Sequence, residues 1–552
     1  MTLQPQGNWN IPSETVRVAQ AALEKGNIYM SIYEQLGQLY EDEDFLKLYP
    51  ARCGRLAFSP GKLALITIMQ FVEGLSDRQA ASAIRARIDW KYILGLELTD
   101  KGIDHSILSE FRSRLVESGQ EKQLLEVMLK KIDQAGFIKQ RGKQRTDATH
   151  VLGAIRKMNR LENVGETLRK ALNDLAVVAP DWLKDQVEPE WYERYGKRVE
   201  AYHFPKSQQK KEQLAIRIGL DGHQLLEALW QETENLWLRQ IESVEVLRQV
   251  WIQQYVIIEG ELKWRSVKET GMPKHSYLIV SPYDIEARNA SKRETNWTGY
   301  KVHLTESCDS ELPHLITNVE TTPATTVDVD VTPRIHQSLA EKQLLPQQHL
   351  LDTGYIDAEN VVISASEHEV ELVGRVLGDN SWQKQSPDAF DLSCFEIDWQ
   401  RKQVKCPLGQ TSHRWRDFQD NSDNPIVEVR FHQSICAACE QRSRCTKAAK
   451  APRILKLRPM AQHQALQTAR EKQTTAEFQA QYAPRAGIEG TISQGVRVNN
   501  LRRSRYIGLA KTHLQHLAIA EAINLSRLSN WFQPIPREPT RTSRFAALEA
   551  SI

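Results

Sequence analysis

Residues 275–377 alternate strand patterns with helical patterns, and this order restricts the possible folds more than any other feature. The stretches "YLIVSPYD", "WTGYKVHLT" and "HLITNVETT" are rich in β-branched and aromatic residues, and "CDSELP" is a plausible turn between the last two. A helical stretch through Ala340, the apolar run "QHLLDTGY", a capped helix in "DAENVVISASE" and a strand in "VELVGRV" follow. This order predicts an α/β fold with a mixed sheet flanked by helices.

The chain is too long for one simple core, because 552 residues normally divide into two to four units. We predict an N-terminal helical domain at 1–140, a first core strand at 141–156, a Trp-rich helical insertion at 157–270, core strands and helices at 271–377, a Cys-rich insertion at 378–456, C-terminal core helices at 457–530, and a flexible basic tail at 531–552. The tryptophans of the helical insertion are expected to build its core.

The first 140 residues have two interpretations. Ser76 with Gln79 three residues later forms a capping-box pattern, and a stripe at helical spacing follows Asp104. Basic residues expected on solvent faces of these short helices fit a helix-turn-helix-like DNA reader; they are Arg85, Arg87, Arg112 and Arg114. A helical packing domain with a solvated face fits the same pattern equally well.

The bulk composition is that of an ordinary soluble globular protein, with 41% hydrophobic and 26% charged residues. A formal charge of +2 means that a polyanionic partner must be recognised by local clusters. The opening "MTLQPQGNWNIPSET" lacks a signal-peptide pattern, and no apolar run reaches the length of a membrane span. These features predict a cytoplasmic protein without a membrane partner.

Two aspartates share one context. Asp147 lies in the predicted strand of "RTDATHVLGAI", and Asp352 ends the apolar run "QHLL". A buried ionised carboxylate is costly unless it is paired, and a divalent cation shared by two neighbouring strands would neutralise both charges. Taken alone, each is more simply an aspartate that caps the loop after its strand.

Glu489 is a candidate third carboxylate. Tyr482, Arg485 and Glu489 are spaced i, i+3 and i+7, so on a helix they would project from one face. The alternative is a weak surface ion pair between Arg485 and Glu489. Gly487 and Gly490 argue against a robust helix at this point.

Several of these segments resemble, in the same order, the DDE-class transposases of bacterial insertion sequences, most closely the family IS eleven-eighty-two. The similar segments are "FSPGKLALITIMQFVEGLSDRQAASAIRARIDWKYILGL", "TDATHV", "NWTGYKVHLTESCD", "LLDTGY" and "RAGIEGTISQGVR…LRRSRYIGLAKTHLQH". The Y-x2-R-x3-E spacing is similar to the signature of the wider superfamily, in which a lysine follows seven residues after the glutamate. Val496 occupies that position here, next to Arg497.

The resemblance implies a ribonuclease H-like core in which Asp147, Asp352 and Glu489 bind two Mg²⁺ ions, with Mn²⁺ as a possible substitute. Such an enzyme hydrolyses DNA at the element ends and directs a 3′-hydroxyl at target DNA. Its partners would be double-stranded DNA, both terminal inverted repeats and target, and further copies of itself in a homodimer or higher oligomer, associated with the bacterial nucleoid. The alternatives are a nuclease that cuts without joining and an inactive, transposase-derived DNA-binding protein.

The residues after Glu489 are candidates for DNA contact, because no acidic residue occurs before Glu521. The basic residues of this stretch are Arg497, Arg502, Arg503, Arg505 and Lys511, and the further candidates are Tyr482, Arg485, Trp297 and Lys301. A solvated helix face is the alternative for the basic stretch. Trp297 packs in the core or stacks on a base at the cut end.

Four cysteines, Cys406, Cys436, Cys439 and Cys445, have the spacing C-x29-C-x2-C-x5-C. Four thiolates can close a tetrahedral structural Zn²⁺ site, with His413 and His432 as possible substitute ligands. The alternative is a set of reduced structural cysteines. Cys53, Cys308 and Cys394 are predicted to be buried small hydrophobic residues.

Overall fold

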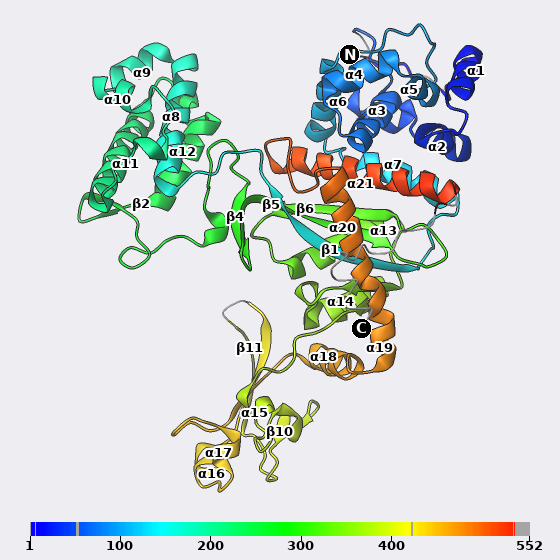
Figure 1. The fold of residues 1–552 in the computed structure, drawn as a ribbon. Coiled ribbons are helices and arrows are strands. Elements are labelled where there is room, and N and C mark those ends of the chain that lie inside the picture. Colours follow the sequence, from blue (N-terminus) through cyan, green and yellow to red (C-terminus); the bar gives the residue numbers. More distant parts are fainter. Residues whose placement is uncertain (1, 6, 51–53, 421–422, 534, 536–552) are drawn as a thin grey trace, which may run out of the picture.

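The computed structural model describes residues 2–5, 7–50, 54–420, 423–533 and 535. A central sheet carries three outlying lobes (Figure 1): the N-terminal helices, a helical insertion, and a small lobe of short strands. None of the helices in these described residues is long and apolar enough to cross a membrane.

The central sheet is mixed, as predicted. It has the order β4 (Arg288–Lys292), β5 (Thr295–Ser307), β1 (Lys143–Leu152), β7 (Gln348–Leu351), β8 (Glu371–Val373), and β6 (Ile316–Pro323) also pairs with β5. Strand β1 is antiparallel to β5 and parallel to β7, which is parallel to β8. The predicted strand in "YLIVSPYD" is wrong, because residues 278–284 form turns and loop after the 3₁₀ turn η4 (His275–Tyr277).

The connections from β6 to β7 and from β7 to β8 are helical. They are the turn η5 (Asp328–Val331) with α13 (Thr332–Glu341) before β7, and the turn η6 (Thr353–Tyr355) with α14 (Ala358–His368) before β8. Helix α14 is capped as predicted, since the Asp357 side chain accepts from the Asn360 backbone N–H at 2.8 Å. The last two helices of the chain, α20 (Gly487–Val498) and α21 (Leu509–Phe532), return to the sheet.

Helix α21 lies between the sheet and the N-terminal lobe (Figure 1). One side packs on β6, and the other packs on helices α2, α3 and α7. Its residues are buried without interruption from Thr512 to Leu525, because it faces protein on both sides. The N-terminal lobe and the sheet therefore share one hydrophobic core.

The N-terminal lobe consists of α1 (Ser13–Ala22), α2 (Ile28–Leu36), η1 (Asp42–Leu48), α3 (Pro60–Glu73), α4 (Asp77–Ala86), α5 (Ile88–Ile93), α6 (Ser106–Glu117) and α7 (Gln123–Gln134). The capping box of Ser76 and Gln79 is confirmed at the start of α4. The solvent position expected for Arg112 is wrong: it is buried and pairs with Asp77 at 2.6 Å. Arg87 pairs with Glu73 and Asp89, which leaves Arg85 as an exposed arginine of α4.

The helical insertion has its own core, built from α8 (Arg160–Val178), α9 (Pro180–Gln186), α10 (Pro189–Tyr195), η2 (Ala201–His203), α11 (Gln208–Gln231), η3 (Leu236–Gln240) and α12 (Glu242–Gln254), followed by a hairpin of β2 (Tyr255–Ile258) and β3 (Glu261–Trp264). Trp191 and Trp251 are buried in this core, as expected. Trp230 and Trp237 are 44% and 46% exposed, so the expectation that all the tryptophans build the core is wrong.

The third lobe contains α15 (Trp382–Gln385), η7 (Leu392–Cys394), β9 (Glu396–Asp398), β10 (Gln403–Lys405), β11 (Arg414–Gln419), β12 (Pro425–Arg430), α16 (Gln433–Ala437), α17 (Arg442–Cys445) and β13 (Ile454–Leu457). Helices α18 (Met460–Lys472) and α19 (Ala476–Tyr482) and the turn η8 (Ala483–Ala486) lead back to α20. Cys308 is buried as predicted, whereas the prediction for Cys394 is wrong because it is exposed. Cys53 and most of the predicted tail at 531–552 lie outside the described residues.

Candidate active site

Asp147 lies in the middle of β1, opposite Leu304 of β5. Its Oδ1 atom accepts from the backbone N–H of Ala148 at 2.8 Å. Its Oδ2 atom accepts from Nη2 of Arg485 at 2.7 Å. One carboxylate oxygen is therefore fixed by the strand, and the other points toward the segment that leads into α20.

Asp352 follows directly after β7, the parallel neighbour of β1. Its Oδ1 atom accepts from the Thr353 N–H at 2.7 Å and caps η6. This local bond is the capping role that the sequence offers as the simpler interpretation. The Oδ2 atom, however, lies 3.9 Å from Nη2 of Arg485, and the side chain is 49% exposed. Asp352 therefore caps its turn and also faces Asp147.

Glu489 lies in the first turn of α20, in a helix that forms despite its glycines. The side chain is 69% exposed, and its Oε1 atom lies 3.2 Å from Nη1 of Arg485. The predicted i, i+4 pair with Arg485 is thus present. A Cβ at Gly487 would overlap the guanidinium of Arg145, so glycine permits the close approach of the helix to β1.

One guanidinium joins the three carboxylates. Arg485 contacts Asp147, Asp352 and Glu489, which come from β1, from the end of β7 and from α20. These residues are far apart in the sequence, so the fold itself brings them together. In the described residues no group of three or more His, Cys, Asp or Glu side chains is arranged to hold a metal ion as it stands.

The charges at this site influence each other. Burial raises the pKa of Asp147, Asp352 raises it further, and the charge of Arg485 opposes both effects. Burial alone would lower the pKa of the Arg485 guanidinium, but the three carboxylates and Tyr482 hold it above its ordinary value. Three carboxylates against one guanidinium leave an excess of negative charge. The hard oxygen donors and this excess fit a divalent cation.

The predicted basic stretch after Glu489 contains exposed residues and residues with partners inside the protein. Arg497, Arg503 and Lys511 are exposed. Arg502 donates to Thr149 of β1 at 2.8 Å, beside a pairing of residues 502–504 with the end of β1. Arg505 stacks on Phe71 and donates to the carbonyl oxygens of Gly74 and Leu75. Part of the stretch therefore holds the N-terminal lobe to the core.

The remaining predicted contact residues are largely engaged within the protein. Trp297 is 5% exposed and donates its indole N–H to the Tyr300 carbonyl at 3.0 Å, which agrees with packing rather than stacking on a base. Lys301 pairs with Asp328 at 2.9 Å. Tyr482 is half-buried and stacks on Phe478.

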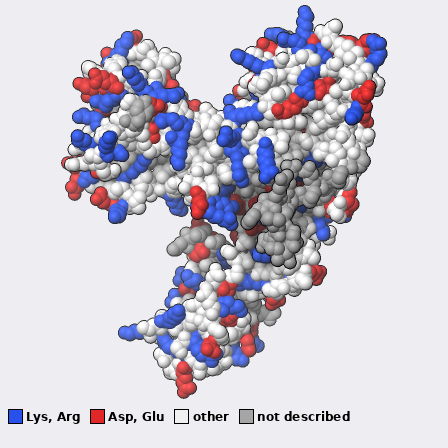
Figure 2. Space-filling view, viewed as in Figure 1, with Lys and Arg blue, Asp and Glu red and all other residues white. Residues whose placement is uncertain are grey.

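Figure 2 shows lysine and arginine side chains on both sides of the notch between the helical insertion and the N-terminal lobe. The notch lies beside the strands of the central sheet in the same view. A cavity of about 970 Å³ is formed by the β4–β5 hairpin and the loop after β6, and its lining includes Lys157, Lys292, Lys301 and Gly354. It therefore lies close to Asp352, two residues before Gly354.

The sequence prediction missed the residues beneath this site. Arg145 precedes Asp147 by two positions, Glu306 lies opposite Arg145 on β5, and Arg527 comes from α21. All three form one hydrogen-bonded network under α20. The strand alternation places Arg145 on the face of Asp147, which was an available signal. Glu306 and Arg527 gave no signal in the sequence.

The four clustered cysteines line one cavity of about 220 Å³ in the third lobe, together with Phe395, Phe431 and Arg453. All four are free thiols of intermediate exposure. Burial raises the pKa of the Cys445 thiol to about 11, so this thiol holds its proton at neutral pH. The substitute ligands His413 and His432 lie against each other, with ring centroids 5.3 Å apart.

Comparisons with known proteins identify two segments. Residues 405–529 match a family model described as a transposase DDE domain, and residues 18–114 match one described as a transposase domain (DUF772). The first match contains Glu489 and the cysteines, whereas Asp147 and Asp352 lie outside both matches. No curated protein and no solved structure matches the chain. Two separate segments of the chain are therefore similar to transposase domains, one of them to a DDE domain.

Proposed function

We propose that the protein is a DNA transposase that binds insertion-sequence ends, cleaves them and transfers a 3′-hydroxyl end into target DNA. The observation that carries this proposal is the convergence of Asp147, Asp352 and Glu489 on Arg485. Two of these acids lie outside the segments that match transposase models, so geometry and family similarity are independent support.

The proposed core is ribonuclease H-like. Its support is a mixed sheet whose first strand, β1, lies in the middle and carries Asp147, while Asp352 ends the adjacent parallel strand. Glu489 comes from a later helix that packs on β1. Each acid thus rests on a regular element or at its end, which keeps the three in a fixed relation.

The three carboxylates are the proposed ligands of two Mg²⁺ ions, which Mn²⁺ could replace, and DDE-type transposases generally use divalent ions. Such ions supply Lewis acidity and an activated nucleophile for phosphoryl transfer. In Asp147 and in Asp352, one carboxylate oxygen accepts from a backbone N–H, and the other oxygen faces the proposed metal site. Arg485 holds the three carboxylates together in the absence of metal. When the carboxylates bind a divalent cation, the Arg485 guanidinium would be free to bind a phosphate group.

DNA is the proposed partner, held by the basic residues of the notch and by the exposed Arg497, Arg503 and Lys511. The arginines that bind carbonyl oxygens within the protein are not needed for this role. The active form is proposed to be a homodimer or higher oligomer that holds two DNA ends together.

A strand-transfer assay tests the proposed function. Purified protein is incubated with Mg²⁺, a supercoiled plasmid and a labelled, pre-cleaved duplex that carries the terminal repeat found beside the gene. We expect the label to appear covalently joined to the plasmid. Cleavage of uncut ends without joining would establish a nuclease instead. DNA binding without cleavage in Mg²⁺ or Mn²⁺ would establish an inactive, transposase-derived binding protein.

The third lobe is proposed to hold a structural zinc ion. Cys406, Cys436, Cys439 and Cys445 line the same cavity, and four thiolates are a common donor set for structural Zn²⁺. The thiols must lose their protons on binding, so zinc affinity should fall as the pH is lowered. The lobe's hydrophobic core is small, so an ion there would supply much of its stability.

Cys439→Ser is therefore expected to lower the zinc content from about one ion per chain to near zero. Metal analysis of protein purified without chelator gives the content, and limited proteolysis within residues 378–456 reports the order of the lobe. Cys394→Ser is the matched control, because Cys394 is exposed and outside the cluster. If the purified wild-type protein contained no zinc, and added zinc left its proteolysis pattern unchanged, the zinc site would be contradicted.

A further inference from the structure

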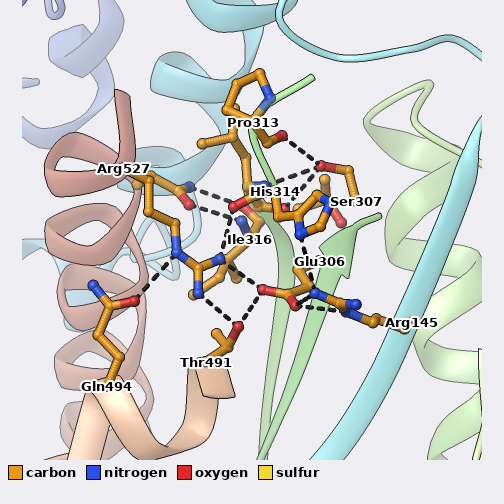
Figure 3. Close-up of polar contacts among 12 residues, drawn as sticks. Arg145, Glu306, Ser307, Pro313, His314, Ile316, Thr491, Gln494 and Arg527 are labelled. Carbon is orange, nitrogen blue, oxygen red and sulfur yellow. Dashed lines mark hydrogen bonds and ion pairs between the residues drawn. The ribbon is translucent and has the colours of Figure 1, made fainter. Parts of the chain in front are cut away.

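Beneath the candidate active site lies a buried cluster of charged residues that catalysis does not require directly (Figure 3). Glu306 is completely buried on β5, directly opposite Arg145 of β1. The Nη2 atom of Arg145 lies 2.6 Å from Glu306, and Nη1 of Arg527 lies 2.7 Å from it. Two guanidinium groups therefore share one carboxylate, away from solvent.

This cluster contacts the two ends of the segment that carries Arg485 and Glu489. Arg145 donates to the carbonyl oxygen of Pro484, just before Arg485. A Cβ at Gly487 would overlap the same guanidinium, so the start of α20 rests directly on Arg145. The backbone on either side of Arg485 is thus held at a fixed height above β1.

Thr491 makes the second connection. It lies in α20, two residues after Glu489, and is buried. Its hydroxyl donates to Oε2 of Glu306 at 2.5 Å and accepts from Nη2 of Arg527 at 2.6 Å. Arg527 also donates to Gln494, one turn further along α20, at 3.2 Å. These bonds fix the rotation of α20 about its axis.

The sheet is irregular at the same point. The register between β5 and β6 shifts between Thr305 and Glu306. Such bulges redirect a side chain and are frequent near active sites. Burying three charges is unfavourable compared with apolar packing, and one well-attested use of such groups is to select a single arrangement of the elements they join.

We propose that Arg145, Glu306, Arg527 and Thr491 form a positioning network that sets the height and rotation of α20, and thereby the place of Glu489 relative to Asp147. The inference rests on the proposed function for its consequence, since Glu489 matters only as a ligand. The four residues act through the backbone and side chains of α20 and of the turn before it, so they are positioning residues.

The test compares Thr491→Val, which keeps the shape and removes the hydroxyl, with Thr491→Ser, which keeps the hydroxyl. We expect T491V to lower the rate of DNA-end cleavage by about tenfold to a hundredfold, because small displacements of a catalytic group have effects of this size. The Mn²⁺ concentration for half-maximal cleavage should rise, and the Kd for end DNA should stay unchanged. In T491S the cleavage rate and the Mn²⁺ concentration for half-maximal cleavage should both lie within about threefold of the wild-type values.

Two further variants separate positioning from loss of stability. Thr167→Val removes a buried hydroxyl of the helical insertion that bonds only to its own helix, and should leave cleavage unchanged. Arg527→Lys keeps the charge beside Glu306 but cannot reach Thr491, Gln494 and the His314 carbonyl together. It should therefore lower cleavage and weaken Mn²⁺ binding as expected for T491V, and it replaces T491V in the test if T491V folds poorly.

Mn²⁺ binding to the protein without DNA, followed by electron paramagnetic resonance, gives a readout independent of turnover. Weaker binding by T491V and restored binding by T491S support the network. Equal Mn²⁺ affinity and equal cleavage in T491V and wild type would overturn the positioning role and leave the proposed function standing. A wild type that neither binds Mn²⁺ nor cleaves DNA would overturn the proposed function, and this inference with it.

Discussion

Asp147→Asn should lower the rate of DNA-end cleavage about a thousandfold, with similar losses for Asp352→Asn and Glu489→Gln. Each substitution removes one ligand charge from the proposed metal site, and such a loss corresponds to about 4 kcal/mol of transition-state stabilisation. Single-turnover cleavage of a labelled terminal repeat at saturating Mg²⁺ measures the effect.

The fold should survive these changes. An amide at position 147 keeps the size of the side chain and one acceptor oxygen, so it can still accept from Ala148, whereas the bond from Arg485 to the second oxygen is lost together with the charge. Asp181→Asn is a suitable control, because this exposed carboxylate pairs with Lys184 in the helical insertion, away from the candidate site. If D147N cleaved DNA as fast as D181N, Asp147 would not be a catalytic ligand.

Glu306→Gln should lower the free energy of unfolding by about 3–5 kcal/mol at pH 7, because it leaves two buried guanidinium groups without their shared counter-charge. Chemical denaturation followed by circular dichroism gives the difference. A matched surface change, Glu245→Gln, removes a half-exposed partner of Arg248 and should alter stability by less than about 1 kcal/mol.

The free energy of unfolding should depend on pH differently in the wild type and in E306Q. Burial alone would raise the pKa of Glu306, but the charges of Arg527 and Arg145 hold it below its ordinary value of 4.5. A depressed folded-state pKa means that the carboxylate's contribution is complete above about pH 4.5 and is lost as the pH falls through the folded value. The stability gap between wild type and E306Q should therefore narrow below pH 4.5. A gap that stayed constant would contradict an ionised, paired Glu306.

The sequence predicts the three carboxylates of the candidate site better than the buried residues beneath them, Arg145, Glu306 and Arg527. Asp147 and Asp352 could be found because a carboxylate within or just after an apolar strand is unusual. Glu489 could be found only in relation to them, since alone its spacing from Arg485 is that of an ordinary surface pair. That pair is indeed present, and the same guanidinium also reaches both aspartates.

Several features escaped prediction because they depend on tertiary contacts that a single sequence does not reveal. Arg112 reads as a solvent charge, but it pairs with Asp77. Arg505 reads as a DNA contact or a solvated charge, and although it is exposed it also binds carbonyl oxygens just after α3. Gly487 reads as a helix breaker, whereas its missing side chain makes room for Arg145. The partners in these contacts are separated by roughly 35 to 430 positions.

Helix α21 also determines when the protein can finish folding. The N-terminal lobe is made first, yet its core is closed by a helix that the ribosome adds roughly 400 residues later. At typical synthesis rates the apolar faces of α2, α3 and α7 would wait about 20–80 s for their partner. The nascent lobe therefore keeps these apolar faces exposed during that interval, and a chain truncated before residue 509 should leave the lobe without its partner helix.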